Sequence, residues 1–252
     1  MNIFLLLLLF FLSQLFSQVG AMLIAYLVPS IPCTPGMNIN AMVLGYLMLI
    51  FNLILLWLLP KCKLTRYEWF ATWPTQRYKM FGPVIGSTLL LALGTSLLVQ
   101  PFNLDDGGST LLFEAMKGDV LCVILLVFVG PLLEEVIFRE GILRQLIMRY
   151  KLNPILSIVL SALAFGFVHA NFMQAIPAIL MGILLGAFYI LSGDIRLSYT
   201  AHVVNNASAI LLLYFPQTNV IDTNWPMPIA LGFGALLCAG SFMWLKKLLL
   251  QK

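Results

Sequence analysis

The sequence predicts an all-α, polytopic membrane protein with about eight transmembrane helices, and two observations carry that prediction. First, 61% of the 252 residues are hydrophobic, only 10% are charged, and the mean hydropathy is +0.99, whereas a soluble domain carries about 25% charged residues. Second, the apolar residues gather in runs close to the roughly 20 residues that a helix needs to cross a bilayer. Helices are expected because backbone groups in lipid must be hydrogen-bonded within their own segment.

Eight apolar segments follow one another along the chain, without a linker or a low-complexity tract. We expect helices at about 2–28, 39–60, 82–101, 119–143, 154–171, 172–192, 197–215 and 227–245. The first segment has no basic residue at its start and exceeds the core of a signal peptide, which has about 7–15 residues. It is interpreted as a retained span, with a cleaved signal peptide as the alternative. Residues 1–252 are therefore predicted to form a single transmembrane domain.

Basic residues predict how these helices are oriented. The loop at 61–81 contains Lys61, Lys63, Arg66, Arg77 and Lys79, and loops rich in lysine and arginine stay in the cytoplasm. Eight alternating spans then place both termini in the cytoplasm, and twelve of the fourteen basic residues fall on that side. The sequence thus predicts a multi-pass protein of the cell (plasma or inner) membrane with both termini cytoplasmic.

Charge and cysteine content argue against two other classes of protein. The formal net charge is +4, and the basic residues stand at the ends of apolar runs rather than in a stripe with interleaved aromatic residues. Nucleic acid is therefore not expected as a partner. Cys33, Cys62, Cys122 and Cys238 form no CxxC pair, so neither a disulfide framework nor a zinc knuckle is expected.

The fourth apolar segment carries charges that a membrane span normally lacks. Each ionisable group in lipid costs at least ~2.5–3.5 kcal/mol, so Glu134, Glu135 and Arg139 need partners, water or a function. Glu135 and Arg139 are four residues apart and can pair on one helix face. Glu134 is rotated away from that face, and an unpaired carboxylate in a low-dielectric site suits a general base. The alternatives are an interhelical ion-pair cluster, charges at the end of the span, and an ion relay in a transporter.

The chain has two histidines, His169 and His202, and both lie in apolar segments. Either one alone is more often a buried core residue than a catalyst, but together with the glutamates they form a constellation. Glu134 lies 15 residues before Arg149, and His169 lies 15 residues after Pro154. Both are therefore expected about 22 Å from the turn of a helical hairpin, at the same depth.

His202 needs a further condition to join them. It is six residues past Arg196, about 9 Å into its helix, and it meets the other two if the polar hairpin at 144–153 projects into the cytoplasm. Asn206 follows His202 by four residues and so shares its helix face. We predict one site within the membrane, nearer its cytoplasmic side, in a catalytic helical core at about 119–215.

These residue types suit the hydrolysis of an amide. That reaction needs a base that activates water and donors that stabilise the oxyanion. Glu134 with His169 can take the proton of the water, and His202 and Asn206 can donate to the oxyanion, so no serine or cysteine nucleophile is required. Zinc is the alternative, because two histidines and one glutamate are a known catalytic zinc set. The chain has no HExxH motif, and the metal-free interpretation is preferred.

The three clusters resemble the motifs EExxxR, FxxxH and HxxxN of the CAAX-protease and bacteriocin-processing family of intramembrane proteases, also called the Abi family. In this chain they read Glu134 to Arg139, Phe165 to His169 and His202 to Asn206. The resemblance covers about 120–212, and residues 1–118 carry no motif that adds to it.

The resemblance implies an eight-helix, glutamate-type protease whose site opens to the cytoplasm. It assigns the activation of water to Glu134 and His169, and the stabilisation of the oxyanion to His202 and Asn206. Glu135 belongs to the same motif and is counted with the catalytic residues, whereas Arg139 and Phe165 are expected to support the site structurally.

The sequence therefore predicts an intramembrane endopeptidase, similar to CAAX prenyl endopeptidases, that cuts a small peptide precursor or the tail of a membrane-associated protein. The expected partners are a peptide or protein substrate and the lipid bilayer, and no cofactor is expected, with zinc as the alternative. The sequence does not indicate an oligomeric state. A non-enzymatic immunity protein or a transporter is the other function considered. Asp105, Asp106 and Asp222 fall in loops and provide no second acidic site for an ion relay.

Overall fold

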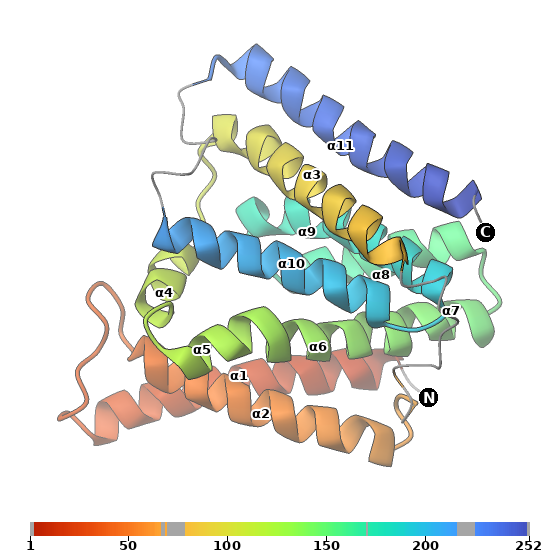
Figure 1. Ribbon diagram of the computed structural model, residues 1–252. Coiled ribbons are helices and arrows are strands. Elements are labelled where there is room, and N and C mark those ends of the chain that lie inside the picture. The colour runs from red at the N-terminus through yellow and green to blue at the C-terminus, as the bar shows by residue number, and fades with distance from the viewer. Residues whose placement is uncertain (1–2, 67–68, 70–78, 170, 216–224, 251–252) are drawn as a thin grey trace.

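A computed structural model describes residues 3–66, 69, 79–169, 171–215 and 225–250, and every regular element in this part of the chain is a helix (Figure 1). The α-helices are α1 (Ile3–Leu27), α2 (Ala41–Lys61), α3 (Phe81–Val99), α4 (Ser109–Met116), α5 (Val120–Ile124), α6 (Gly130–Glu135), α7 (Arg144–Met148), α8 (Pro154–Phe167), α9 (Phe172–Ser192), α10 (Arg196–Tyr214) and α11 (Met227–Leu250). A 3₁₀ turn η2 (Gln100–Phe102) follows α3, and two π-helical segments, η3 (Leu125–Val129) and η4 (Val136–Leu143), connect α5, α6 and α7. The predicted all-α fold is confirmed.

Each of the eight predicted segments is helical, and six helices are long and apolar enough to cross a bilayer. They are Ile3–Leu27, Ala41–Lys61, Phe81–Phe102, Val120–Met148, Phe172–Ser192 and Met227–Lys246. The chain is thus a multi-pass membrane protein. The fifth segment ends early, because α8 has 14 residues and rises only about 21 Å. The seventh, α10, is long enough to cross a bilayer, but it carries several polar residues and is less apolar than the six spans.

One helix was not predicted. The loop expected at 102–118 contains α4, which begins after Gly108 in a left-handed conformation (φ +78°) and ends at Met116. Several sequence features fall outside the described residues: most of the basic loop at 61–81, with Arg77, and also Asp222 and Lys252.

Polar side chains cap the first turns of α5, α8 and α9. Asp119 accepts a hydrogen bond from the Cys122 N–H at 2.9 Å, and Asn153 accepts one from the Ile155 N–H at 2.8 Å. Asn171 does the same for Gln174 at 2.8 Å. Such caps satisfy amide groups that the first helical turn leaves unpaired, so these short side chains define where α5, α8 and α9 begin.

The helices pack in layers. Figure 1 shows α11 beside α3 on one side and α1 beside α2 on the other, with α8, α9, α10 and the continuous helix 120–148 between them. The first pair touches closely at Gly94, where an added Cβ would lie 2.9 Å from the Gly234 carbonyl oxygen. Because the helix 120–148 lies between the α3–α11 pair and the α1–α2 pair, it is inside the bundle, and its charged residues can contact partners from several helices.

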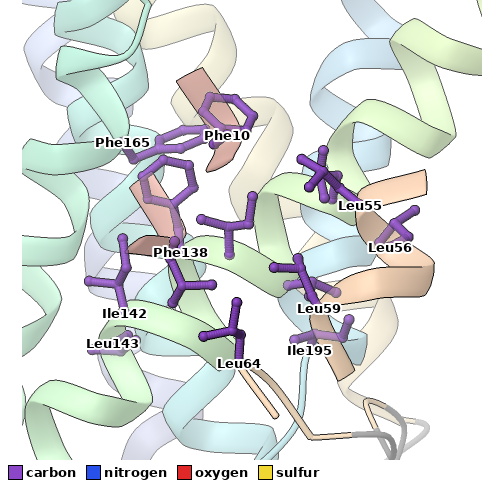
Figure 2. Close-up of a cluster of buried hydrophobic side chains, with 14 of the residues drawn as sticks. Phe10, Leu55, Leu56, Leu59, Leu64, Phe138, Ile142, Leu143, Phe165 and Ile195 are labelled. Atoms are coloured by element: carbon purple, nitrogen blue, oxygen red, sulfur yellow. The ribbon is translucent and has the colours of Figure 1, made fainter. Parts of the chain in front are cut away.

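An aromatic cluster fills the space between α1, the helix 120–148 and α8. The Phe138 ring lies 6.0 Å from that of Phe10 and 5.2 Å from that of Phe165, edge to face in both pairs (Figure 2). All three rings are buried. This cluster fixes α8 against η4 at the level of the candidate site.

The third glutamate of the charged run, Glu140, joins three parts of the chain. It is fully buried, and its carboxylate accepts hydrogen bonds from both Nε and Nη2 of Arg66, the latter at 2.8 Å. The Tyr189 hydroxyl donates to the same carboxylate at 2.7 Å, and Arg144 Nε lies 3.6 Å away. Glu140 thus connects the segment after α2 to η4 and α9.

Candidate active site

A π-helical turn opens the helix 120–148 one turn before the two adjacent glutamates. The Gly130 N–H donates to the carbonyl of Leu125, five residues back. The Leu126 carbonyl consequently loses its α-helical donor, and the next residue in the π register is Pro131, which has no N–H. The side chain of Asn206 takes its place, because Nδ2 donates to the Leu126 oxygen at 2.9 Å. The last residue of the third motif is therefore attached to the helix that carries the first.

Asn205 fixes the amide of Asn206 from the other side. Its Nδ2 donates to Asn206 Oδ1 at 3.1 Å, so the oxygen and one N–H of Asn206 are both used. The second Asn206 N–H is left for another acceptor. Sequence reasoning assigned no role to Asn205, although a second amide in an apolar segment was a visible signal.

His202 lies between the two glutamates and is 4% exposed. Its Nδ1 is 3.1 Å from Glu135 Oε1, and its Nε2 is 3.5 Å from Glu134 Oε2. Glu135 also faces Arg139, with 3.3 Å between Oε2 and Nε. The expected pairing of Glu135 with Arg139 is present, and the contact with His202 adds a second role for the carboxylate that the sequence did not suggest.

The Phe165 ring contacts the histidines of both the second and the third motif. Its ring lies edge-on to the rings of His169, at 5.0 Å, and His202, at 5.6 Å. The Arg139 guanidinium lies 4.9 Å from the same ring, within the range of a cation–π contact. Phe165 and Arg139 are both buried, and their supporting role stays a prediction.

The backbone of Phe165 also sets the tautomer of His169. Its carbonyl oxygen lies 2.8 Å from His169 Nδ1. Because a carbonyl can only accept, Nδ1 carries the proton, and the neutral ring presents Nε2 as a base. His169 follows the C-terminus of α8 and was expected to lie beside Glu134. No direct contact between these two side chains occurs in the described structure, but both line one cavity.

That cavity has a volume of about 540 Å³ and lies between α1, α2, α3, α4, the helix 120–148, α9 and α10. Glu134, His169, His202, Asn205 and Asn206 all line it, whereas Glu135 and Arg139 do not. It includes Ser109, Thr110 and Phe113 of α4, which lies at the opposite end of the bundle from α7 (Figure 1). The cavity thus extends away from the end of the bundle that carries α7 and Arg144. The position of the site nearer the cytoplasmic side stays a prediction.

The donor set does not resemble a zinc site. Among the residues that the structure describes, no three His, Cys, Asp or Glu side chains are grouped so that they could hold a metal ion. Both ring nitrogens of His202 already face carboxylates, those of Glu134 and Glu135. Two histidines and one glutamate in this arrangement do not converge on one point, as tetrahedral zinc requires.

Comparison with known proteins identifies the middle of the chain. Residues 116–208 match the family model described as type II CAAX prenyl endopeptidase Rce1-like. The curated protein named "Putative membrane peptidase YdiL", of Bacillus subtilis (strain 168), is 27% identical over 111 residues, which are 44% of this chain and 45% of that protein. The chain thus spans about half the length of that relative. No solved structure matches.

The matched segment contains all three motifs and the helices that bring them together. It includes the helix 120–148, α8, α9 and α10 as far as residue 208. Five residues of the three motifs line the cavity: Glu134, Phe165, His169, His202 and Asn206. This segment is therefore similar to the type II CAAX prenyl endopeptidases, which is consistent with the resemblance of the three motifs to the CAAX-protease and bacteriocin-processing family.

Proposed function

We propose that this protein is an intramembrane endopeptidase that hydrolyses a peptide bond with a water molecule activated by Glu134 and His169. The observation that carries the proposal is the convergence of Glu134, His169, His202 and Asn206 on one cavity inside a bundle of apolar helices. The family match over the same helices supports it. The proposed substrate is a small peptide precursor or the tail of a membrane-associated protein.

The chemistry follows from the donors and acceptors around the cavity. A water held between Glu134 and His169 Nε2 attacks the carbonyl carbon, and its proton passes to Glu134. The negative charge that develops on the carbonyl oxygen is stabilised by the free N–H of Asn206 and by an Nε2–H of His202. Glu134 then returns the proton to the departing nitrogen as the C–N bond breaks.

The position of His202 suits the role of oxyanion donor. With Nδ1 donating to Glu135, the proton on Nε2 of the imidazolium form points at Glu134. The two carboxylates hold this ring between them. As negative charge develops on the substrate oxygen, the hydrogen bond that Nε2–H makes to Glu134 can shift to that oxyanion, while the proton stays on Nε2. Glu135 acts through His202 and is best described as a positioning residue.

The test of the enzyme is peptide cleavage by purified protein in detergent. A library of internally quenched peptides from bacterial membrane-protein tails and peptide precursors is compared for wild type, Glu134→Gln and His169→Ala. Loss of general base catalysis is expected to lower kcat by about 10²–10⁴-fold. Glu114→Gln is the matched control, since this carboxylate pairs with Lys117 on α4 and does not line the cavity. Cleavage by Glu134→Gln at the wild-type rate would refute the proposal.

We propose further that the reaction needs no metal, that the protein resides in the cell membrane, and that both termini are cytoplasmic. The arrangement of the histidines supports the first point, and the distribution of basic residues supports the other two. Activity that persists after exhaustive chelation, with no zinc by elemental analysis, is the expected result. For topology, cysteine-reactive labelling from outside intact cells should leave a terminal cysteine tag unmodified at either end.

A further inference from the structure

Two carboxamides, Gln14 on α1 and Asn52 on α2, stand in the wall of the cavity. Both lie outside the segment 116–208 that matches the family model. Asn52 is only 3% exposed and sits in a helix that is otherwise almost wholly apolar. Apolar side chains would satisfy the packing of α1 on α2 at lower cost, because burying an amide is unfavourable unless it is fully hydrogen-bonded.

The two amides satisfy each other poorly. Gln14 Nε2 lies 3.4 Å from Asn52 Oδ1 and 3.3 Å from the Ser13 hydroxyl, both beyond the usual range for N–H···O bonds. In the described structure neither Asn52 Nδ2 nor Gln14 Oε1 has a hydrogen-bond partner. One donor and one acceptor are thus left over side by side in the wall of the cavity.

A peptide about to be cut needs such partners. In a helix the carbonyl of each peptide bond is already hydrogen-bonded, so a cleavable segment must be unwound. An unwound backbone in apolar surroundings has unpaired N–H and C=O groups, which are costly in lipid. A carboxamide pair offers a donor and an acceptor that complement one peptide group. Neutral hydroxyls and amides from several helices continue the polar wall: Thr95, Ser96, Ser109, Thr110, Gln174 and Asn205.

The charges of the wall restrict which part of a peptide fits. No lysine or arginine is among the residues that line the cavity in the described structure, and Glu134 is its one carboxylate. A free C-terminal carboxylate would lie there without a cationic partner and beside a like charge, which is unfavourable. An uncharged segment within a longer chain avoids both costs.

We propose that Gln14 and Asn52 bind the backbone of an unwound, uncharged internal segment of the substrate and hold it against Glu134 and His202. The proposal rests on the proposed peptidase function and names the substrate class of that site. It assigns a task to α1 and α2, which carry no motif, and makes them determinants of substrate binding.

The test uses short, internally quenched peptides of Leu, Ala, Gly, Ser and Thr, prepared with either an amidated or a free C-terminus. For the amidated peptides, the double variant Gln14→Leu/Asn52→Leu is expected to raise KM about tenfold, with kcat within about twofold of wild type. The exchange variant Gln14→Asn/Asn52→Gln, which keeps both amides, is expected to restore most of the affinity. Ser17→Ala is the matched control, since its hydroxyl binds the Ser13 carbonyl on α1 outside the cavity.

A binding measurement separates this inference from the proposed function. The inactive Glu134→Gln protein is photo-crosslinked to the same amidated peptide, with and without the double leucine substitution. If wild type cleaves no peptide but the leucines still weaken crosslinking about tenfold, the peptidase function fails and the backbone site stands. If wild type cleaves while the leucines change neither KM nor crosslinking, or if free C-terminal peptides are preferred, the inference is wrong and the peptidase function stands. Absence of both cleavage and crosslinking would overturn both.

Discussion

His202 Nδ1 lies 3.1 Å from Oε1 of Glu135, a carboxylate with no exposed surface. The second glutamate of the motif thus orients the imidazole that faces the cavity and also pairs with Arg139. A carboxylate in that position fixes which ring nitrogen carries a proton and how the ring is oriented, as in the Asp–His pair of serine proteases.

Replacement of Glu135 by glutamine keeps the shape but lets the amide present an N–H to His202. The ring would then lose the acceptor that fixes its orientation, and its Nε2 would no longer be held as a donor to the oxyanion. We expect kcat to fall by about 10²–10⁴-fold with little change in KM, by analogy with the effect of a wrong tautomer in a triad. Kinetics on a quenched peptide measure this, and a variant with full kcat would contradict the role of Glu135. Glu114→Gln is again the matched control, because this carboxylate does not line the cavity.

Asn206→Ala removes the donor to Leu126 and the proposed donor to the oxyanion. Loss of one oxyanion donor lowers kcat by about 10²–10³-fold, and loss of the bond to Leu126 should lower stability by about 1 kcal/mol. Asn205→Ala removes only the bond to Asn206 Oδ1 and is expected to cost less than tenfold in kcat. Thermal unfolding and single-turnover kinetics of both variants distinguish the two contributions. Equal kcat values for both variants would count against Asn206 as a donor.

Much of the fold and part of the candidate site follow from patterns that are local in sequence. Apolar length locates the helices, and the spacing of Glu134 and His169 predicts that they lie at one depth; both line the cavity together with His202. The contact of His202 with Glu135 could not be foreseen, because it depends on how α10 lies against the helix 120–148. The π turn that directs Asn206 to Leu126 is likewise a product of tertiary packing, which helical periodicity does not encode.

The cavity wall shows the same limit more clearly. Gln14 and Asn52 belong to segments with no motif, and only the packing of α1 and α2 against the motif-bearing helices places them near Glu134. A polar residue in an apolar segment was the available signal, but it does not say which cavity the residue faces. The partners of the buried Glu140, namely Arg66 and Tyr189, were missed for the same reason.

Arg66→Met tests how far the buried Glu140 depends on its bidentate partner. Glu140 has no exposed surface, whereas the Arg66 side chain is 39% exposed. Removal of one partner of a buried pair costs about 3–5 kcal/mol, but Tyr189 and Arg144 remain, so we expect a loss of about 2 kcal/mol. The exposed Glu114–Lys117 pair gives the comparison, since Glu114→Gln should cost at most about 1 kcal/mol. Unfolding in detergent measures both, and equal losses would show that Glu140 does not need Arg66.

Asp119 should make stability sensitive to acid. The Cys122 N–H and the Tyr46 hydroxyl, at 2.9 and 2.8 Å, hold the pKa of this capping carboxyl below its usual value. A folded pKa below the unfolded value of about 3.9 means that the contribution is complete above that pH. It is lost as pH falls through the folded pKa. Asp119→Asn should lower the melting temperature at pH 7 and flatten its decline on acidification. A decline as steep as that of the wild type would exclude Asp119 as a source.

Pro131 is the residue that keeps the Leu126 carbonyl available to Asn206. In Pro131→Ala, the new N–H stands in the π register of that carbonyl and competes with Asn206 Nδ2. We expect the melting temperature to stay equal or rise, because the helix regains a backbone hydrogen bond, while kcat falls severalfold as Asn206 loses its fixed position. Pro60→Ala is the control, since Pro60 lies in the last turn of α2 and does not line the cavity. A Pro131→Ala enzyme with unchanged kcat would mean that Asn206 is positioned without the help of the π turn.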